Sequence, residues 1–165
     1  MSQVRVDPDF AVPDPAKVRE VAKTCICFNL RRGARAVTQY FDALFQEHGL
    51  RATQFTLLDA IYLMELNHQP VTISVLAEGL VMDRTTLARN LKPLEREGLV
   101  EVEPGRDQRT RMITLTDDGR AKLAQVLVLW EEGQAHFTEM LGAANMLGLL
   151  HGIGVTVEAA QENEP

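Results

Sequence analysis

The sequence predicts a mainly α-helical fold with one small β-hairpin. Apolar residues recur at three- and four-residue steps through most of the 165-residue chain, as on the buried face of a helix. Strand-like alternation is confined to residues 99–103 and 109–115, and the turn-forming residues 104–108 between them predict a hairpin. A chain of this length can bury an adequate core as one compact unit of two lobes.

The first 50 residues predict an arm followed by a long helix. Residues 1–13 contain two prolines and two aspartates, which indicates an extended segment. Asp14 followed by Pro15 is typical of a helix start, because aspartate caps free N–H groups and proline is tolerated at the first helical position. We expect one uninterrupted helix from there to His48, ended by Gly49.

Three helices are predicted in the middle of the chain. The first covers about residues 53–67 and ends before Pro70, because proline cannot continue a helix. Thr72 then caps a second, short helix that ends at about Leu80. Asp83 caps the third helix, which follows after a short turn.

The third helix covers residues 84–97 and is amphipathic. Leu87, Leu91 and Leu94 repeat at helical spacing and therefore predict its buried row. Pro93 lies inside the helix and removes one backbone hydrogen bond, so we expect a bend there.

The chain after the hairpin predicts two more helices. Asp117 opens a long one, whose apolar stripe includes Trp130, and we expect this tryptophan in the core. A second segment, about residues 143–160, is rich in Leu, Met and Gly and is also predicted to be helical. Residues 158–165 predict a frayed acidic tail.

Charge is distributed unevenly along the chain. The formal net charge is −6, but residues 84–111 hold seven basic and five acidic side chains, a balance of +2. Residues 117–165 hold two basic and eight acidic side chains, a balance of −6. Only the middle of the chain therefore offers a suitable face for a polyanion such as a nucleic acid.

Several classes of protein are excluded by composition and motifs. No run approaches the ~18 to 20 apolar residues that span a bilayer, and the N-terminus lacks the apolar core of a signal peptide. We therefore expect a cytoplasmic protein with no membrane partner. The sequence contains no Gly-x-Ser-x-Gly, no phosphate-binding glycine loop and no His-Glu-x-x-His, so we expect no enzymatic activity, no cofactor and no metal.

Two helices joined by a short turn, with a hairpin directly behind them, form a winged helix-turn-helix. In this arrangement the second helix enters the DNA major groove and leads with its N-terminal residues. Arginine can form two hydrogen bonds with guanine, asparagine two with adenine, and a threonine methyl can contact a thymine methyl. The residues we expect at DNA are Arg84, Thr85, Thr86, Arg89 and Asn90. Lys92 and Arg96 follow, at backbone phosphates or only in solvent.

The hairpin brings three arginines together, Arg106, Arg109 and Arg111. An arginine at the tip of a wing can enter the minor groove or hold phosphates. Asp107 lies among them, and we expect it to pair with Arg109 or Arg111 and so brace the wing. The alternative is a winged fold that binds a protein and not DNA, because fold alone does not fix function. The basic tip and the polar face of the preceding helix argue against it.

Cys25 and Cys27 are the only cysteines. On one continuous helix they would point about 200° apart and could not form a disulfide with each other. The first interpretation is a buried small residue plus an incidental thiol. The second is a thiol sensor of oxidants or effectors, oxidised singly or paired across subunits. Cys-x-Cys alone offers too few ligands for a metal site.

The ordered motifs from Thr72 to Gly119 resemble the DNA-binding core of the MarR family of bacterial regulators. They are Leu76-Ala77, residues 85–91, residues 94–100, Asp107-x-Arg109 and Leu115-Thr116-x-x-Gly119. The flanking helices also match the family layout. The resemblance therefore implies a winged helix-turn-helix at residues 51–116 and a helical dimerisation region at residues 1–50 and 117–165.

The same resemblance implies a function. A MarR-family homodimer is expected to bind double-stranded DNA at a pseudo-palindromic operator and to act as a repressor that responds to a small-molecule effector or an oxidant. The effector would bind in a cleft between the dimerisation and DNA-binding lobes.

Overall fold

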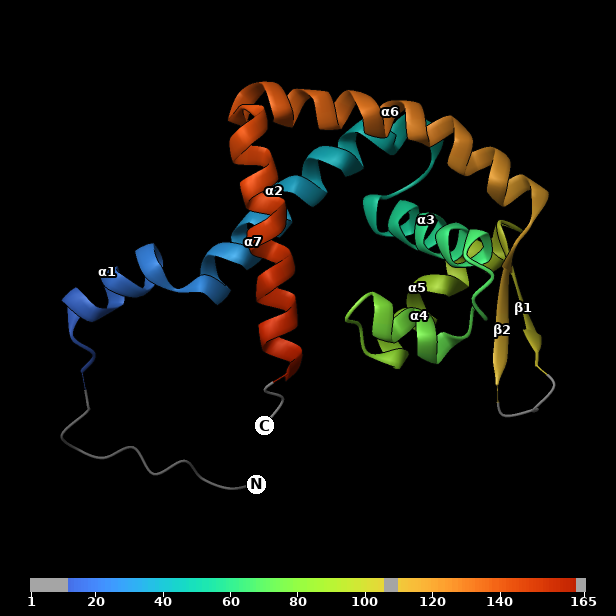
Figure 1. Ribbon diagram of the computed structural model, residues 1–165, viewed down its shortest axis with the longest axis horizontal. Helices are drawn as coiled ribbons and strands as arrows, with labels where there is room; N and C mark the ends of the chain where they lie inside the picture. Colours follow the sequence, from blue (N-terminus) through green and yellow to red (C-terminus); the bar gives the residue numbers. More distant parts are fainter. Residues whose placement is uncertain (1–11, 106–109, 163–165) are drawn as a thin grey trace. The chain divides into compact units, whose positions relative to one another are not determined.

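A computed structural model describes residues 12–105 and 110–162. The chain divides into two compact units, Met1–Tyr40 and Phe41–Pro165. Helices dominate both units, and the only sheet among the described residues is a two-stranded hairpin (Figure 1). The predicted mainly α-helical fold with a small hairpin is confirmed.

The first unit contains α1 (Pro15–Thr24) and the first part of α2 (Ile26–Phe45). Asp14 caps α1 as predicted, because its carboxylate accepts a hydrogen bond of 2.9 Å from the N–H of Ala16. The single long helix that we predicted is wrong. The chain breaks at Cys25, whose backbone is extended at φ −67° and ψ 114°.

The break is stabilised by side chains on either side of it. The hydroxyl of Thr24 donates to the carbonyl of Glu20 at 2.9 Å. The amide of Asn29 donates to the carbonyl of Cys25 at 2.9 Å and to that of Ala22 at 3.5 Å. Backbone carbonyls around the break are therefore satisfied without a continuous helix.

The second unit begins with the end of α2 and turns into α3 (Ala52–Leu66). The short 3-10 turn η2 (Gln46–His48) ends at Gly49, whose φ of 67° suits a residue without a Cβ. Asp42 in α2 then accepts a 2.8 Å hydrogen bond from the N–H of Ala52, the first residue of α3. The predicted helix over residues 53–67 is confirmed to within one residue at each end.

The helix pair follows as α4 (Ile73–Gly79) and α5 (Arg84–Arg96). Thr72 caps α4 by accepting from the N–H of Val75 at 3.2 Å, and Asp83 caps α5. Both caps are confirmed. Pro93 lies inside α5, and the bend expected there stays a prediction.

The hairpin consists of β1 (Val100–Pro104) and β2 (Arg111–Leu115), which pair antiparallel with Val100 opposite Leu115. The N–H of Ile113 donates to the carbonyl of Val71 at 2.9 Å, so β2 is also tied to the segment before α4. In Figure 1 the hairpin lies beside α3 and α5, and α3 and α5 each pack against one of its strands.

The core of the second unit lies between α3, α4, α5, the hairpin and the first half of α6. Its fully buried side chains come from each of these elements and from the end of α2. They are Phe45, Leu57, Leu58, Ile61, Leu76, Leu87, Leu94, Val100, Ile113 and Val126. A chain of aromatic contacts extends it, with ring centroids 5.5 Å apart for Phe41 and Phe45 and 5.2 Å apart for Phe45 and Phe55.

The C-terminal part forms α6 (Asp117–Leu141) and α7 (Ala143–Glu162), with Thr116 as the N-cap of α6. Because α7 runs to Glu162, the frayed tail that we predicted from Glu158 is wrong up to that residue. Trp130 is 36% exposed on α6, so within one chain it does not lie in the core as expected.

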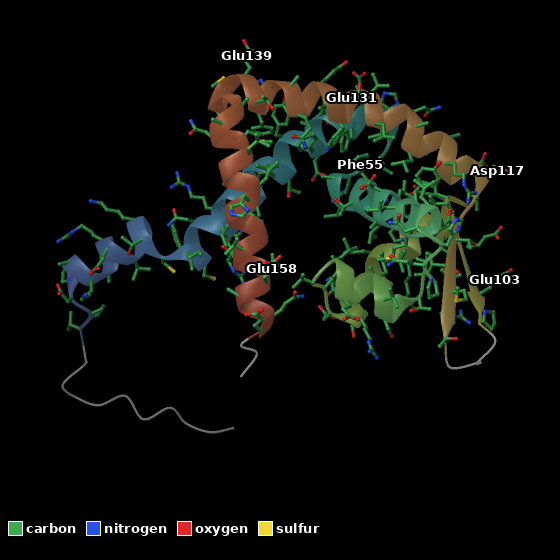
Figure 2. All side chains as sticks on the ribbon, viewed as in Figure 1. Phe55, Glu103, Asp117, Glu131, Glu139 and Glu158 are labelled. Carbon is green, nitrogen blue, oxygen red and sulfur yellow. The ribbon has the colours of Figure 1, made fainter. Side chains whose placement is uncertain are left out.

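Acidic side chains lie along both helices, with Asp117, Glu131 and Glu139 on α6 and Glu158 on α7 (Figure 2). Among the described residues, no single helix is long and apolar enough to cross a membrane. Taken together, α6 and α7 have the length and composition of a membrane span, but the chain bends by 107° between them.

Candidate nucleic-acid interface

The first turn of α5 is held by its N-cap. The carboxylate of Asp83 accepts a 2.8 Å hydrogen bond from the N–H of Thr86. Hydrogen bonds from the side chain and the backbone of Thr86 are the main cause that lowers the pKa of Asp83 below 3.8, and the positive charge of Arg89 adds to it. The residues that follow Asp83 are therefore fixed at the start of a regular helix.

One side of α5 is buried and the opposite side is exposed. Leu87, Leu91 and Leu94 are buried, which confirms the predicted row. At 100° per residue, the face directly opposite carries side chains that are all exposed. They are Thr85, Arg89, Lys92 and Arg96. Arg84 is also exposed, but by the same angular spacing it lies nearer to the leucine row than to these four. We call these four opposite residues the α5 outer face.

The outer face is cationic and largely unneutralised. Among the described residues, Arg84, Arg89 and Lys92 form no ion pair, whereas Arg96 approaches Glu97 with a nitrogen–oxygen distance of 4.0 Å. A row of exposed cations on a capped helix is what a phosphate backbone and the base edges of a groove require.

Three of the predicted contact residues on α5 lie off this face, namely Arg84, Thr86 and Asn90. Arg84 is exposed, whereas Thr86 and Asn90 are both half-buried. The amide of Asn90 donates to the sulfur of Met82 at 3.9 Å and lines a cleft. Sequence position alone had grouped Asn90 with the exposed residues, but its helical angle turns it toward the protein.

The cleft that Asn90 lines lies between the end of α2, the start of α3 and the second half of α5. Its volume is about 870 Å³. The lining is mostly polar, with Asp42, Gln46, Arg51, Gln54 and Arg96 among its residues. A molecule in this cleft would therefore touch both the start of α3 and the helix that carries the outer face.

The hairpin carries one cation among the described residues. Arg111 is exposed at the start of β2, where it pairs with Pro104. The other predicted wing residues, Arg106, Asp107 and Arg109, lie outside the described residues.

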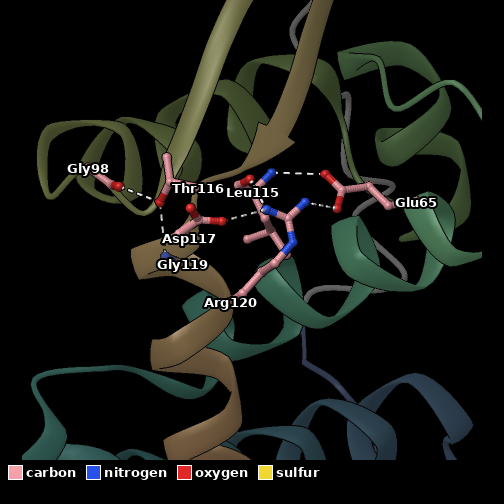
Figure 3. A network of polar contacts seen from close by, with 7 residues as sticks. All are labelled: Glu65, Gly98, Leu115, Thr116, Asp117, Gly119 and Arg120. Carbon is pink, nitrogen blue, oxygen red and sulfur yellow. Dashed lines mark hydrogen bonds and ion pairs between the residues drawn. The ribbon is translucent and has the colours of Figure 1, made fainter.

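A network of polar contacts joins the base of the hairpin to α3 and α6 (Figure 3). The carboxylate of Glu65 accepts from the N–H of Leu115 at 2.9 Å and forms an ion pair with Arg120 at 2.7 Å. Arg120 also donates to the carbonyl of Leu115 at 2.7 Å. The sequence analysis missed this pair, although an acid within the apolar pattern of α3 is the kind of signal that indicates a buried partner.

Thr116 completes the base of the hairpin. Its hydroxyl donates to the carbonyl of Gly98 at 2.7 Å and accepts from the N–H of Gly119 at 2.9 Å. The end of α5, the end of β2 and the start of α6 therefore meet at one residue.

The two cysteines lie at the break between α1 and α2. Both are free; Cys25 is partly buried and Cys27 is exposed. The described residues contain no group of three or more metal-ligating side chains of the His, Cys, Asp and Glu types.

The sequence and the structure of this chain resemble those of known regulators of transcription. The sequence profile of the MarR family matches residues 48–110. The crystal structure of the M. tuberculosis transcriptional regulator MosR in complex with DNA shares 37% sequence identity and a TM-score of 0.75, over 84% of this chain and 97% of that one. The chain belongs to the MarR family. The predicted resemblance is confirmed.

Two further relatives support this assignment. The structure of the transcriptional repressor CouR bound to a 23-mer DNA duplex matches with 25% identity and a TM-score of 0.70, over 89% of this chain and 99% of that one. The organic hydroperoxide resistance transcriptional regulator of Bacillus subtilis (strain 168) is 30% identical over 95 residues, which cover 57% of this chain. The alignment spans only 62% of that regulator's own length. The MarR profile covers α3, α4, α5 and β1, and it therefore includes the helix that carries the outer face.

Proposed function

We propose that this MarR-family chain is a sequence-specific DNA-binding regulator of transcription that acts as a repressor. The observation that carries the proposal is the α5 outer face, a row of exposed cations opposite a buried leucine row on a capped helix. The structures of MosR in complex with DNA and of CouR bound to a DNA duplex support it. A chain with this role acts in the cytoplasm and has no catalytic site.

The expected role of each DNA-binding residue depends on its position along α5 or on the hairpin. Thr85 and Arg89 lie near the start of the outer face and meet base edges in the major groove. Lys92 and Arg96 lie further along and meet backbone phosphates, which set affinity more than sequence preference. The wing arginines, Arg111 among them, hold the backbone or enter the minor groove.

The repressor is a homodimer in this proposal. α1 and α7 have no buried residue within one chain, and large apolar side chains are exposed along both. They include Val18, Val21, Leu147, Leu150 and Ile153. A second copy would cover such surfaces with a two-fold interface, which in turn matches a pseudo-palindromic site.

Selection from a pool of random duplexes, followed by fluorescence anisotropy at several salt concentrations, tests this function. The reduced, effector-free protein should enrich a palindrome with half-sites about one helical turn apart. Its affinity for the selected duplex should fall steeply with salt, because phosphate contacts release counterions. Binding without any preference over a shuffled duplex would rule the proposal out.

Oxidation of the thiols is the first proposed input. Cys27 is exposed beside a helix break, so an oxidant can reach its sulfur. A thiolate attacks a hydroperoxide oxygen and becomes a sulfenic acid, while the peroxide is reduced to an alcohol. Peroxide treatment should change DNA affinity in the wild type and leave a Cys25→Ser, Cys27→Ser double variant unaffected. An equal response of both proteins would end this part of the proposal.

A small-molecule effector in the cleft is the second proposed input. The guanidinium groups of Arg51 and Arg96 and the amides of Gln54 and Asn90 suit a ligand that carries carboxylate oxygens. Benzoate is a simple probe of this class. It should raise the melting temperature of the wild type more than that of Arg51→Ala, and an equal rise in both would place its binding elsewhere.

A further inference from the structure

We propose that Glu65 and Arg120 form a clamp that sets the position of the wing and so determines how the hairpin meets DNA. The proposal rests on the DNA-binding function proposed above and assigns these two residues a positioning role in it. We call Glu65, Arg120 and the backbone of Leu115 the wing clamp.

The wing clamp is a closed set of charge-assisted hydrogen bonds (Figure 3). One carboxylate oxygen of Glu65 accepts from the N–H of Leu115 at 2.9 Å, and the other meets a guanidinium nitrogen of Arg120 at 2.7 Å. A second nitrogen of Arg120 donates to the carbonyl of Leu115 at 2.7 Å. Both backbone polar groups of one strand residue are thus held by one ion pair.

The partners come from three elements that are distant in sequence. Glu65 lies near the end of α3, Leu115 is the last residue of β2, and Arg120 lies in the first turns of α6. The contacts therefore fix the end of the strand against two helices at once. Removal of Arg120 leaves the Glu65–Leu115 hydrogen bond, and removal of Glu65 leaves the Arg120–Leu115 hydrogen bond, so either change loosens the strand end on one side.

The ion pair of the wing clamp is partly shielded from solvent. The side chain of Glu65 is 20% exposed and that of Arg120 is 42% exposed, so solvent screens their attraction only in part. Asp117 approaches Arg120 at 3.8 Å, but it is fully exposed and lies at the edge of the arrangement. Glu65 is therefore the carboxylate that orients Arg120.

The geometry explains why the clamp would act on the wing more than on α5. On the side away from β1, β2 is attached by its buried side chains Ile113 and Leu115, by the Ile113–Val71 hydrogen bond and by the clamp, all of which lie in the part of the strand from Ile113 onward, away from Arg111. Arg111 lies at the opposite end of the strand from Leu115, so a rotation at the clamped end displaces Arg111 most. The position of α5 depends instead on Leu87, Leu91 and Leu94, which are buried in the core.

A double-mutant cycle in DNA affinity tests the clamp. Arg120→Met keeps most of the side chain's length and removes its hydrogen bonds, and we expect about tenfold weaker binding to the selected duplex, as for a lost DNA contact. Arg111→Ala should weaken binding by a similar factor. If the clamp acts through the wing, the double variant should be no weaker than the weaker single variant, because both changes remove the same contact.

Controls separate positioning from loss of fold and from failure of the proposed function. Asp117→Asn removes the exposed neighbouring carboxylate and should leave affinity unchanged, and Arg120→Met combined with Arg89→Ala should show multiplied losses. Circular dichroism at the assay temperature confirms that each variant is folded. Absence of binding by the wild type would refute the DNA-binding function itself. With a wild type that binds, an unchanged Arg120→Met, an unchanged Arg111→Ala, or multiplied losses in their double variant would each overturn the clamp.

Discussion

Gly119 allows the start of α6 to lie directly against the chain where α5 meets the hairpin. A Cβ at this position would overlap the backbone carbonyl oxygen of Leu99 and would come within 3.0 Å of a methyl group of Leu115. The same carbonyl accepts a hydrogen bond of 3.2 Å from the N–H of Thr116. Gly119→Ala therefore requires the backbone at Leu99 to move, because rotation of a side chain cannot relieve the overlap.

Three contributions set the expected loss of unfolding free energy for Gly119→Ala. Overpacking against backbone belongs at the upper end of the usual range, about 3 kcal/mol. A weakened Thr116–Leu99 hydrogen bond adds about 1 kcal/mol. The better helix propensity of alanine offsets about 1 kcal/mol. We therefore expect a net loss of about 3 kcal/mol, which at a urea dependence of about 2 kcal/mol per M lowers the midpoint by about 1.5 M.

Urea unfolding followed by circular dichroism, at one fixed protomer concentration, measures this loss. Gly79→Ala is the matched control, because a Cβ there meets only the terminal methyl of Met64 at 3.1 Å, which can move aside. We expect this control to stay within about 1 kcal/mol of the wild type. Equal midpoints for Gly119→Ala and Gly79→Ala would refute the argument that backbone contact at Gly119 is limiting.

Three further predictions concern the same unit. Val81 has a φ of 51° in the turn between α4 and α5, which is strained for a branched side chain, so Val81→Gly should raise stability by up to ~1 kcal/mol, and a lower melting temperature would contradict this. The pKa of Asp83 is lowered in the folded state, so its cap stabilises fully above pH 3.8 and is lost as the pH falls below that value. The difference in urea midpoint between wild type and Asp83→Ala, which lacks a capping oxygen, should thus shrink in acid, and a difference that stays constant with pH would contradict a role for the Asp83 charge in the cap. At Gly133 a Cβ would overlap the ring of Phe41, so Gly133→Ala should cost about 1–3 kcal/mol in urea unfolding, whereas no loss would show that the ring moves freely.

Local signals predicted much of the second unit from the sequence. Asp83 and Thr72 each accept a hydrogen bond from an N–H three residues further along, so their effects follow from local chemistry. The break at Cys25 did not follow, because neither proline nor glycine marks it. It depends on hydrogen bonds from Asn29 to carbonyls four and seven residues earlier, one of several arrangements that an asparagine can adopt.

The candidate site was predicted in outline and corrected in detail. The cations of the outer face and the half-buried position of Asn90 both follow from the angular spacing to the buried leucines, whereas the contact of its amide with Met82 does not. Glu65 and Arg120 are 55 positions apart, and only the fold brings them together. Pairings at such separations depend on tertiary packing, which local patterns do not contain.

The most direct test of the central claim compares Arg89→Ala and Arg89→Lys on two duplexes, the selected site and a shuffled one, by fluorescence anisotropy. If the outer face of α5 reads bases, Arg89→Ala should cost about 1–3 kcal/mol on the selected site and far less on the shuffled one. Arg89→Lys should recover little of that loss, because lysine keeps the charge but cannot form the paired hydrogen bonds to guanine. Equal losses on both duplexes, fully recovered by lysine, would show that Arg89 supplies only charge and would contradict the account.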